Sequence, residues 1–187
     1  MSSHHIVRDN QEPALLILEA VTVPFEIVQE LLEWSPSVMV DESQLDTLLR
    51  WGIKIDMVLF QEKNKEEIIE KVSEQFPIKL LSCQAHEDVL TMALHFLRSG
   101  KYPSVNILTH QRTIFHYLLS FESEINMVVI QDKIRWSLVR SGYFEKRVAD
   151  HSMTFVLENN LNKLIIPDPE NKIRIKKESP FWVGEQL

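Results

Sequence analysis

Val38–Leu59, which reads VMVDESQLDTLLRWGIKIDMVL, decides the fold. The stretch begins and ends with a short apolar run of the kind that forms a buried strand. Ser43, with Asp46 three residues later, makes a loose capping box and predicts that a helix begins there. The apolar stripe of that helix is formed by Leu45, Leu48 and Leu49. Gly52 stands where a glycine commonly ends a helix, so the stretch predicts a parallel strand–helix–strand unit.

The same alternation continues on both sides of this unit, through residues 13–130. The expected strands are Ala14–Leu18, Val38–Val40, Met57–Phe60, Ile78–Ser82, Val105–Leu108 and Met127–Ile130. The expected helices cover residues 25–34, 43–51, 64–74, 87–98 and 112–120. Strands that alternate with helices of about ten residues are typical of a mostly parallel sheet. We therefore predict an α/β fold, with a Rossmann-like, mostly parallel sheet and flanking helices over residues 1–131.

Beyond residue 131 the pattern changes to short runs that alternate apolar and polar residues. The expected strands there begin at Ile134 and continue at residues 154–157, 164–166, 173–175 and 181–183. This pattern predicts a small antiparallel, β-sandwich-like domain at residues 132–187. In the run 172–176, three basic side chains, Lys172, Arg174 and Lys176, alternate with isoleucines. We interpret them as the solvated face of a strand, with a phosphate-binding strip as the alternative.

Composition excludes several classes of function. The net charge is −7, which argues against a nucleic acid or an anionic membrane as the main partner. No apolar run approaches the roughly 18 residues that a membrane span needs, and the first ten residues lack the apolar centre of a signal peptide. The single cysteine, Cys83, excludes an internal disulfide. We expect a cytoplasmic protein. The four glycines lie far apart, so no glycine-rich phosphate loop is expected.

The stretch Val38–Leu59 resembles the thiamine pyrophosphokinase family. In that family a strand ends in Asp, a helix follows, and a Gly-Ile-x-Pro-Asp turn leads into the next strand. Asp41, Gly52, Ile53 and Asp56 match this pattern, whereas Ile55 replaces the usual proline. The C-terminal SPFWVGE, residues 179–185, is similar to the last strand of the family. The resemblance implies transfer of a diphosphate from ATP to thiamine with the help of Mg²⁺, and a homodimer.

The residues that hold Mg-ATP in the family are altered here. Where the family has Gly-Asp-Phe-Asp-Ser after the third strand, this chain has Phe60-Gln61-Glu62-Lys63-Asn64. In the second motif, Thr-Asp-Leu-x-Lys-Ala, Asp88 stands one residue early and Met92 replaces the lysine. In the third motif only Arg112 matches, and Ile114 stands where Asp is expected. Three segments of one site have changed together.

Two hypotheses follow from this combination. The first is a non-catalytic binding or interaction protein without a cofactor, whose ligand is a thiamine-like molecule or a nucleotide. The second is an active ATP-dependent enzyme with a rearranged Mg²⁺ site. The resemblance implies three sets of site residues for it. The metal ligands would be Asp41, Asp56 and Glu62. The catalytic residues would be Asp56, Asp88 and Arg112, and the cofactor or ligand contacts would be Asp41, Arg112 and Trp182.

Each of these residues also has a purely structural interpretation. The carboxylates of Asp41, Asp56, Glu62 and Asp88 converge only if all four lie at the carboxyl ends of neighbouring strands, where open α/β sheets bind ligands. Otherwise, Asp41 and Asp56 simply end strands and begin turns. Trp182 is then part of the core of the antiparallel region. A shared Mg²⁺ requires that the carboxylates lie within about 8 Å of one another, since Mg–O distances are about 2.1 Å.

Overall fold

The computed structural model describes residues 12–20, 23–84, 87–149 and 152–187. Six parallel strands form the first part of the sheet in this region, in the order β4-β3-β2-β1-β5-β6. They are β1 (Ala14–Ile17), β2 (Ser37–Asp41), β3 (Met57–Gln61), β4 (Lys79–Cys83), β5 (Ser104–Leu108) and β6 (Asn126–Gln131). β1 lies at the centre, where Leu16 pairs with Met39 of β2 and Ile107 of β5. The predicted mostly parallel sheet is confirmed.

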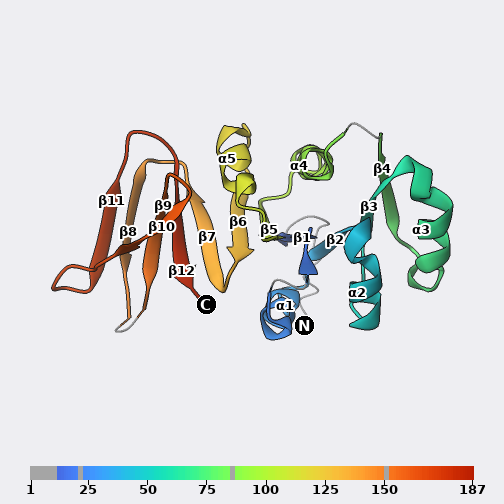
Figure 1. Ribbon diagram of the computed structural model, residues 1–187, viewed down its shortest axis with the longest axis horizontal. Coiled ribbons are helices and arrows are strands. Elements are labelled where there is room, and N and C mark those ends of the chain that lie inside the picture. The colour runs from blue at the N-terminus through green and yellow to red at the C-terminus, as the bar shows by residue number, and fades with distance from the viewer. Residues whose placement is uncertain (1–11, 21–22, 85–86, 150–151) are drawn as a thin grey trace, which may run out of the picture.

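Helices cover both faces of this sheet (Figure 1). One face carries α1 (Phe25–Leu32), α2 (Leu45–Arg50) and α3 (Lys65–Lys71), and the other carries α4 (Val89–Ser99) and α5 (Thr113–Ser120). The alternation of side chains along β1 explains the two layers. Leu15 and Ile17 pack with the first group of helices, whereas Leu16 packs with α4 and α5.

Short 3-10 turns replace the ends of several predicted helices, namely η2 (Glu42–Gln44), η3 (Glu62–Asn64) and η4 (Ser73–Gln75). The capping box proposed for Ser43 and Asp46 was wrong, because Asp41 is the residue that caps this turn and Asp46 instead pairs with Lys71 at 3.1 Å. The role of Gly52 is confirmed. Its φ of +67° lets the next amide, that of Ile53, donate back into α2.

The antiparallel region extends the same sheet. Four strands, β7 (Ile134–Val139), β12 (Phe181–Gln186), β9 (Thr154–Glu158) and β10 (Leu161–Ile165), follow β6 to complete ten strands. A separate ribbon, β8 (Tyr143–Arg147) with β11 (Lys172–Lys176), packs against them. The predicted antiparallel strands are therefore present. Hydrogen-bonded pairing runs without a break across residue 131, and the domain boundary there stays a prediction.

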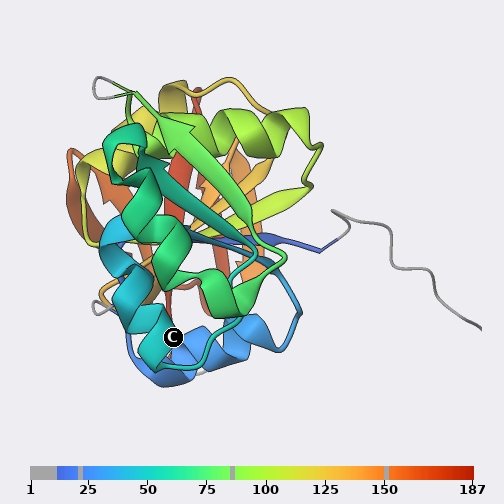
Figure 2. The same ribbon diagram turned by 90° about the vertical axis from the view of Figure 1, so that its right-hand side faces the viewer.

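A tight aromatic contact joins β7 to β12. Gly184 lies opposite Trp136 in the register of these strands. A Cβ atom on Gly184 would lie 2.8 Å from the Trp136 ring. The missing side chain thus leaves room for a fully buried indole. Figure 2, which looks along the sheet from the β4 end, shows the strands stacked behind one another between the two helical layers.

Two of the three basic residues of β11 are paired with acids. Lys172 contacts Glu170, and Arg174 contacts both Asp168 and Glu145. These ion pairs favour the interpretation of β11 as a charged, solvated strand. In the described part of the chain no helix is long and apolar enough to cross a membrane.

Candidate functional site

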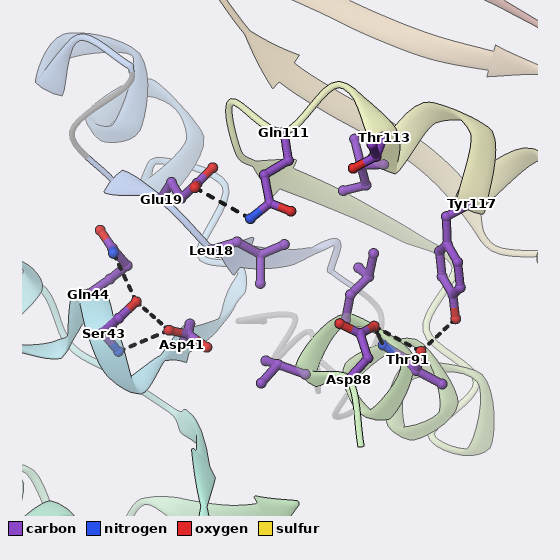
Figure 3. A pocket seen from close by; sticks show the side chains of 13 residues that line it. Leu18, Glu19, Asp41, Ser43, Gln44, Asp88, Thr91, Gln111, Thr113 and Tyr117 are labelled. Carbon is purple, nitrogen blue, oxygen red and sulfur yellow. Dashed lines mark hydrogen bonds between the residues drawn. The ribbon is translucent and has the colours of Figure 1, made fainter. Parts of the chain in front are cut away.

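A cavity of about 580 Å³ opens at the carboxyl ends of the central strands (Figure 3). The chain leaves β1 towards β2 on one side, whereas β5 lies on the other side of β1 and is reached only after β4. The strand order therefore reverses between β1 and β5. Such a reversal leaves a crevice in which open α/β sheets bind their ligands. Residues from the ends of β1 and β2, the start of α4 and the segment from β5 into α5 line the cavity.

Glu19 joins the two strands that border the reversal. The residue follows β1, and its carboxylate accepts hydrogen bonds from the Thr109 hydroxyl at 2.8 Å and the His110 amide at 2.7 Å. The His110 ring nitrogen Nδ1 lies 2.7 Å from the same oxygen. Gln111 donates to the other oxygen at 3.5 Å. One acid thus fixes the loop after β5 against the end of β1.

Asp41 lies at the end of β2 and caps the turn that follows. Its carboxylate accepts from the Ser43 amide at 2.9 Å and also contacts the Ser43 hydroxyl. Gln44 donates to that hydroxyl at 3.0 Å and accepts from the Ala20 amide at 3.0 Å. The acid, the serine and the glutamine form a polar wall, which Figure 3 shows facing the cavity.

Asp88 lies across the cavity, at the N-terminus of α4. Its carboxylate accepts from the Thr91 amide at 2.8 Å and the Thr91 hydroxyl at 2.9 Å, which is the bonding pattern of a helix N-cap. The Thr91 hydroxyl also lies 2.8 Å from the Tyr117 hydroxyl of α5. This chain of contacts connects the two helices that cover one side of the sheet.

The cavity combines negative charge with an apolar wall. Three carboxylates line it, those of Glu19, Asp41 and Asp88, and no lysine, arginine or histidine is among its lining residues in the described part of the chain. The apolar wall is formed by Leu18, Val89, Leu90 and Ile114. This mixture favours a small ligand that has an apolar body and either a positive charge or several hydrogen-bond donors.

The structure does not bring Asp56 to this site. Asp56 precedes β3 and therefore lies at the opposite, amino-terminal edge of the sheet, where it accepts from the Val38 amide at 2.9 Å. Asp41 is in register with Leu59, three residues further along β3, and three residues of strand span about 10 Å. The expectation that Asp41 and Asp56 share a cation was wrong, because one acid ends a strand and the other precedes one.

Glu62 lies at the carboxyl edge of the sheet, but its contacts are with residues outside the cavity. It begins η3 directly after β3, and Lys65 donates to its carboxylate at 3.3 Å. Hydrogen bonds from Ser82 and Lys65 lower the pKa of the Glu62 carboxyl. Glu62 is not among the residues that line the cavity. In the segment 60–64, the first two residues therefore end β3 and the last three form the 3-10 turn η3.

Arg112 connects the two halves of the chain. Its guanidinium donates to the Asn160 carbonyl at 3.1 Å and lies 3.6 Å from the Asp132 carboxylate. Both partners belong to hairpin turns of the antiparallel region, and Arg112 does not line the cavity. In this arrangement, Arg112 holds α5 against those turns.

Trp182 belongs to the core. Its side chain is 1% exposed, and its indole nitrogen donates to the Phe115 carbonyl at 3.1 Å. The tryptophan borders a second cavity, of about 490 Å³, between α5 and the β9–β10 turn. Its predicted contact with a ligand would have to be made there and not at the carboxyl edge.

The residues of the main cavity do not fit Mg-ATP. Among the described residues, no group of three or more His, Cys, Asp or Glu side chains is placed to hold a metal ion. Asp41 and Asp88 each already accept from the following turn. A polyphosphate also needs cationic side chains or clustered backbone amides, and the lining offers three carboxylates instead.

Glu19 was not identified from the sequence. It stands two residues after the first buried strand, and the loop after that strand borders the point where the strand order reverses. An acid at that position in the chain is the signal that could have indicated it. Thr91 and Tyr117 had no such signal, because their pairing depends on how α4 packs beside α5.

These features define an α/β protein. Its mostly parallel sheet has helices on both faces, antiparallel strands extend the sheet, and a cavity lies where the strand order reverses. No family model and no curated protein matches the sequence. Solved structures do match. A thiamine pyrophosphokinase from Bacillus subtilis is 10% identical with a TM-score of 0.61, over 94% of this chain and 99% of that one. The enzyme from Candida albicans is 9% identical with a TM-score of 0.61, over 94% and 90%.

A probable thiamine pyrophosphokinase from Staphylococcus saprophyticus gives the same result, with 14% identity and a TM-score of 0.59 over 93% of this chain and 98% of that one. The protein thus has the thiamine pyrophosphokinase fold along nearly its whole length. The predicted fold is confirmed.

Proposed function

We propose that this protein is a non-catalytic member of the thiamine pyrophosphokinase-like group that binds a small organic molecule. The observation that carries the proposal is the charge of the cavity at the carboxyl edge, where Asp41 and Asp88 lie on opposite sides and the described lining holds no lysine, arginine or histidine. The crevice at the strand-order reversal is present, but its described lining is acidic and apolar and does not fit Mg-ATP. A cytoplasmic location, which the composition favours, and a homodimer, which the family resemblance implies, are part of the proposal.

Diphosphate transfer depends on neutralising the charge of the transferred group. Enzymes do this with Mg²⁺, Lys and Arg placed around the phosphates. Here Arg112 is occupied by Asn160 and Asp132, and Lys65 by Glu62. The charge of the cavity would repel a triphosphate, so we expect no turnover.

The same charge favours an organic cation. Thiamine carries a permanently charged thiazolium ring and a flat aminopyrimidine ring that donates hydrogen bonds. The charge and the donors suit the carboxylates of the cavity, and the ring faces suit Leu18, Val89 and Ile114. We therefore propose a thiamine-like cation as the ligand in preference to a nucleotide.

A second function has one observation in its favour. Asp41 and Asp88 line the same cavity from opposite sides, and Mg²⁺ in nucleotide sites is often held by one or two carboxylates together with the substrate phosphates. An active diphosphotransferase would need both acids to leave their turns and bind the ion.

One experiment separates the two functions. Purified protein is titrated by calorimetry with thiamine, with thiochrome, its uncharged fused-ring oxidation product, and with Mg-ATP, while AMP release is followed with thiamine and Mg-ATP together. We expect thiamine to bind, thiochrome and Mg-ATP to bind far more weakly, and no AMP to form. AMP release that is lost in the Asp88→Asn variant would establish the active alternative. Equal binding of thiochrome and thiamine would overturn the assignment of a cationic ligand.

A further inference from the structure

Tyr117 reaches the main cavity from α5, and its hydroxyl belongs to a chain of hydrogen bonds. The Tyr117 hydroxyl lies 2.8 Å from the Thr91 hydroxyl, which in turn lies 2.9 Å from the Asp88 carboxylate. All three residues line the cavity. Figure 3 shows the chain of contacts running from Tyr117 to the first turn of α4. A ligand in the cavity therefore meets this chain and not an isolated phenol.

The carboxylate fixes the direction of both bonds in the chain. An ionised carboxylate only accepts hydrogen bonds, and a hydroxyl has a single proton to donate. The Thr91 proton is used on Asp88, so the Thr91 oxygen accepts from Tyr117. The Tyr117 proton is then used as well. Because the Tyr117 hydroxyl has no other partner among the described residues, it offers the cavity only its lone pairs.

The chain also makes the Tyr117 oxygen a stronger acceptor. Hydrogen bonds that follow one another polarise each other, so a hydroxyl that donates its proton carries more negative charge on its oxygen. Here the chain ends on the full negative charge of Asp88, with Thr91 between the two. The Tyr117 oxygen is thus prepared to receive an N–H group.

The opposite wall of the cavity presents an acceptor too. Both contacts of Ser43 with Asp41 are made to the Oδ1 atom, and both contacts of Thr91 with Asp88 are made to the Oδ2 atom. In the described part of the chain, the second oxygen of each acid has no partner. A ligand between the two walls therefore faces three oxygens that can only accept, one each from Asp41, Asp88 and Tyr117.

We propose that Tyr117 is a specificity-determining residue, whose oxygen accepts a hydrogen bond from an amino group of the ligand. This role rests on the proposed function, in which the cavity binds an organic cation, and it adds a group that the cation must carry beside α4 and α5. A carbonyl or ether oxygen in the same place would face the oxygens of Tyr117 and Asp88 with no proton between them. Polar groups that stay unpaired in this way weaken binding.

A purely structural role of the same contact predicts a different result. If the Tyr117–Thr91 bond only held α5 beside α4, its loss would weaken the binding of all ligands alike. A role in selection instead changes the ratio of the affinities for two ligands of equal charge and similar shape. This ratio is the quantity to measure.

The first test compares three cations on the unmodified full chain. They are N-methylpyridinium ions that carry an amino, a methyl or an acetyl group in the para position. Amino and methyl groups are similar in size and all three ions are permanently charged, so the donor is the main difference. Titrations followed by amide NMR, with Thr91 and Tyr117 as local reporters, give the dissociation constants. We expect the amino ion to bind about tenfold more tightly than the methyl ion, and the acetyl ion to bind most weakly. Equal binding of the amino and methyl ions would overturn the proposal.

The second test changes the chain of hydrogen bonds. Tyr117→Phe removes the acceptor, so the preference for the amino ion over the methyl ion should disappear. Thr91→Val frees the Tyr117 proton to donate into the cavity, and the acetyl ion should gain affinity relative to the amino ion. Thr91→Ser puts the hydroxyl back and should restore the wild-type preference.

Tyr102→Phe is the matched control for Tyr117→Phe. The Tyr102 hydroxyl donates to Ser37 at 3.3 Å, and Ser37 begins β2 at the amino edge of the sheet, away from the main cavity. The preference for the amino ion should therefore be unchanged in Tyr102→Phe. A Tyr117→Phe variant that keeps the full preference, or a Tyr102→Phe variant that loses it equally, would contradict the role of Tyr117.

The ligand and the role of Tyr117 can fail separately. Thiamine binding without any preference among the pyridinium ions would leave the proposed function in place and overturn the role of Tyr117. A preference for the amino ion without thiamine binding would support the role of Tyr117 and exclude thiamine as the ligand. If neither thiamine nor any of the ions binds, both proposals are wrong.

Discussion

The indole nitrogen of Trp182 donates a hydrogen bond of 3.1 Å to the main-chain carbonyl of Phe115. The two rings also meet edge to face, with centroids 5.2 Å apart and planes at 76°. The contact joins the last strand of the sheet to α5, which lies beside the carboxyl-edge cavity. The antiparallel strands thus contribute to the position of a helix that lines the candidate site.

Replacement of Trp182 by Phe should lower the free energy of unfolding. The variant loses a buried hydrogen bond, worth about 1–3 kcal/mol when its partner stays unsatisfied, and it leaves a void beside Phe115. Urea unfolding followed by far-UV circular dichroism measures the change. Trp34→Phe is the control, because Trp34 is 70% exposed and its replacement should change the stability by less than about 0.5 kcal/mol. Equal effects of the two substitutions would contradict the proposed role of Trp182.

Much of this fold was predictable because its signals are local. The stretch Val38–Leu59 shows both strands and the helix between them through apolar spacing alone, and Gly52 marks where the helix ends. β8 was missed for the opposite reason. Its residues, Tyr143–Arg147, are mostly exposed, so no apolar alternation indicates a strand, and its pairing with β11 depends on residues far along the chain.

Gly184→Ala should destabilise the protein by about 1–3 kcal/mol, the usual cost of overpacking a core. The new methyl group would lie 2.8 Å from Trp136 and from Ile134, and both of these neighbours are buried. Thermal unfolding measures the effect. Gly52→Ala separates a contact from a backbone effect, since nothing lies within 4 Å of a Cβ there but φ is +67°. We expect about 1–2 kcal/mol for Gly52→Ala from the left-handed backbone alone. A Gly184→Ala variant as stable as the wild type would show that Trp136 can move.

The candidate site was harder to predict than the fold. Asp41 and Asp88 could be placed at the carboxyl edge, because each stands between a strand and the helical segment that follows it. Asp56 carries the same carboxylate, but it precedes its strand and therefore lies at the opposite edge of the sheet. It was predicted as a site residue because it matches a family motif. The contacts of Glu19 with residues 109–111 join segments about 90 positions apart in the chain, and no local pattern shows them.

Asp88→Asn should separate the charge of the cavity from the capping of α4. Asparagine caps a helix about as well as aspartate, so the stability should stay within about 0.5 kcal/mol of the wild type. Thiamine binding should weaken several-fold, since one of three carboxylates is lost. Asp88→Ala is the contrasting variant, because it removes the bonds to Thr91 and should cost about 1 kcal/mol of stability. Calorimetry and urea unfolding on the two variants decide the question, and unchanged thiamine binding in both would remove Asp88 from the site.

Asp168→Asn should flatten the acid side of the stability profile. Hydrogen bonds from the Lys172 amide and the Glu170 amide, together with the charge of Arg174, lower the pKa of the Asp168 carboxyl. A carboxyl whose pKa is lower in the folded state stabilises the protein above its unfolded pKa, and this contribution disappears as the pH falls through the folded value. The effect should therefore appear below about pH 4, the ordinary range of an aspartate.

Melting temperatures from pH 7 to pH 2.5 should fall less steeply for Asp168→Asn than for the wild type, because asparagine can still accept the amide bonds but cannot be protonated in this range. The replacement itself should lower the melting temperature at pH 7, where the ion pair with Arg174 at 2.8 Å is intact. Parallel profiles for the two proteins would show that Asp168 does not contribute to the acid sensitivity of the fold.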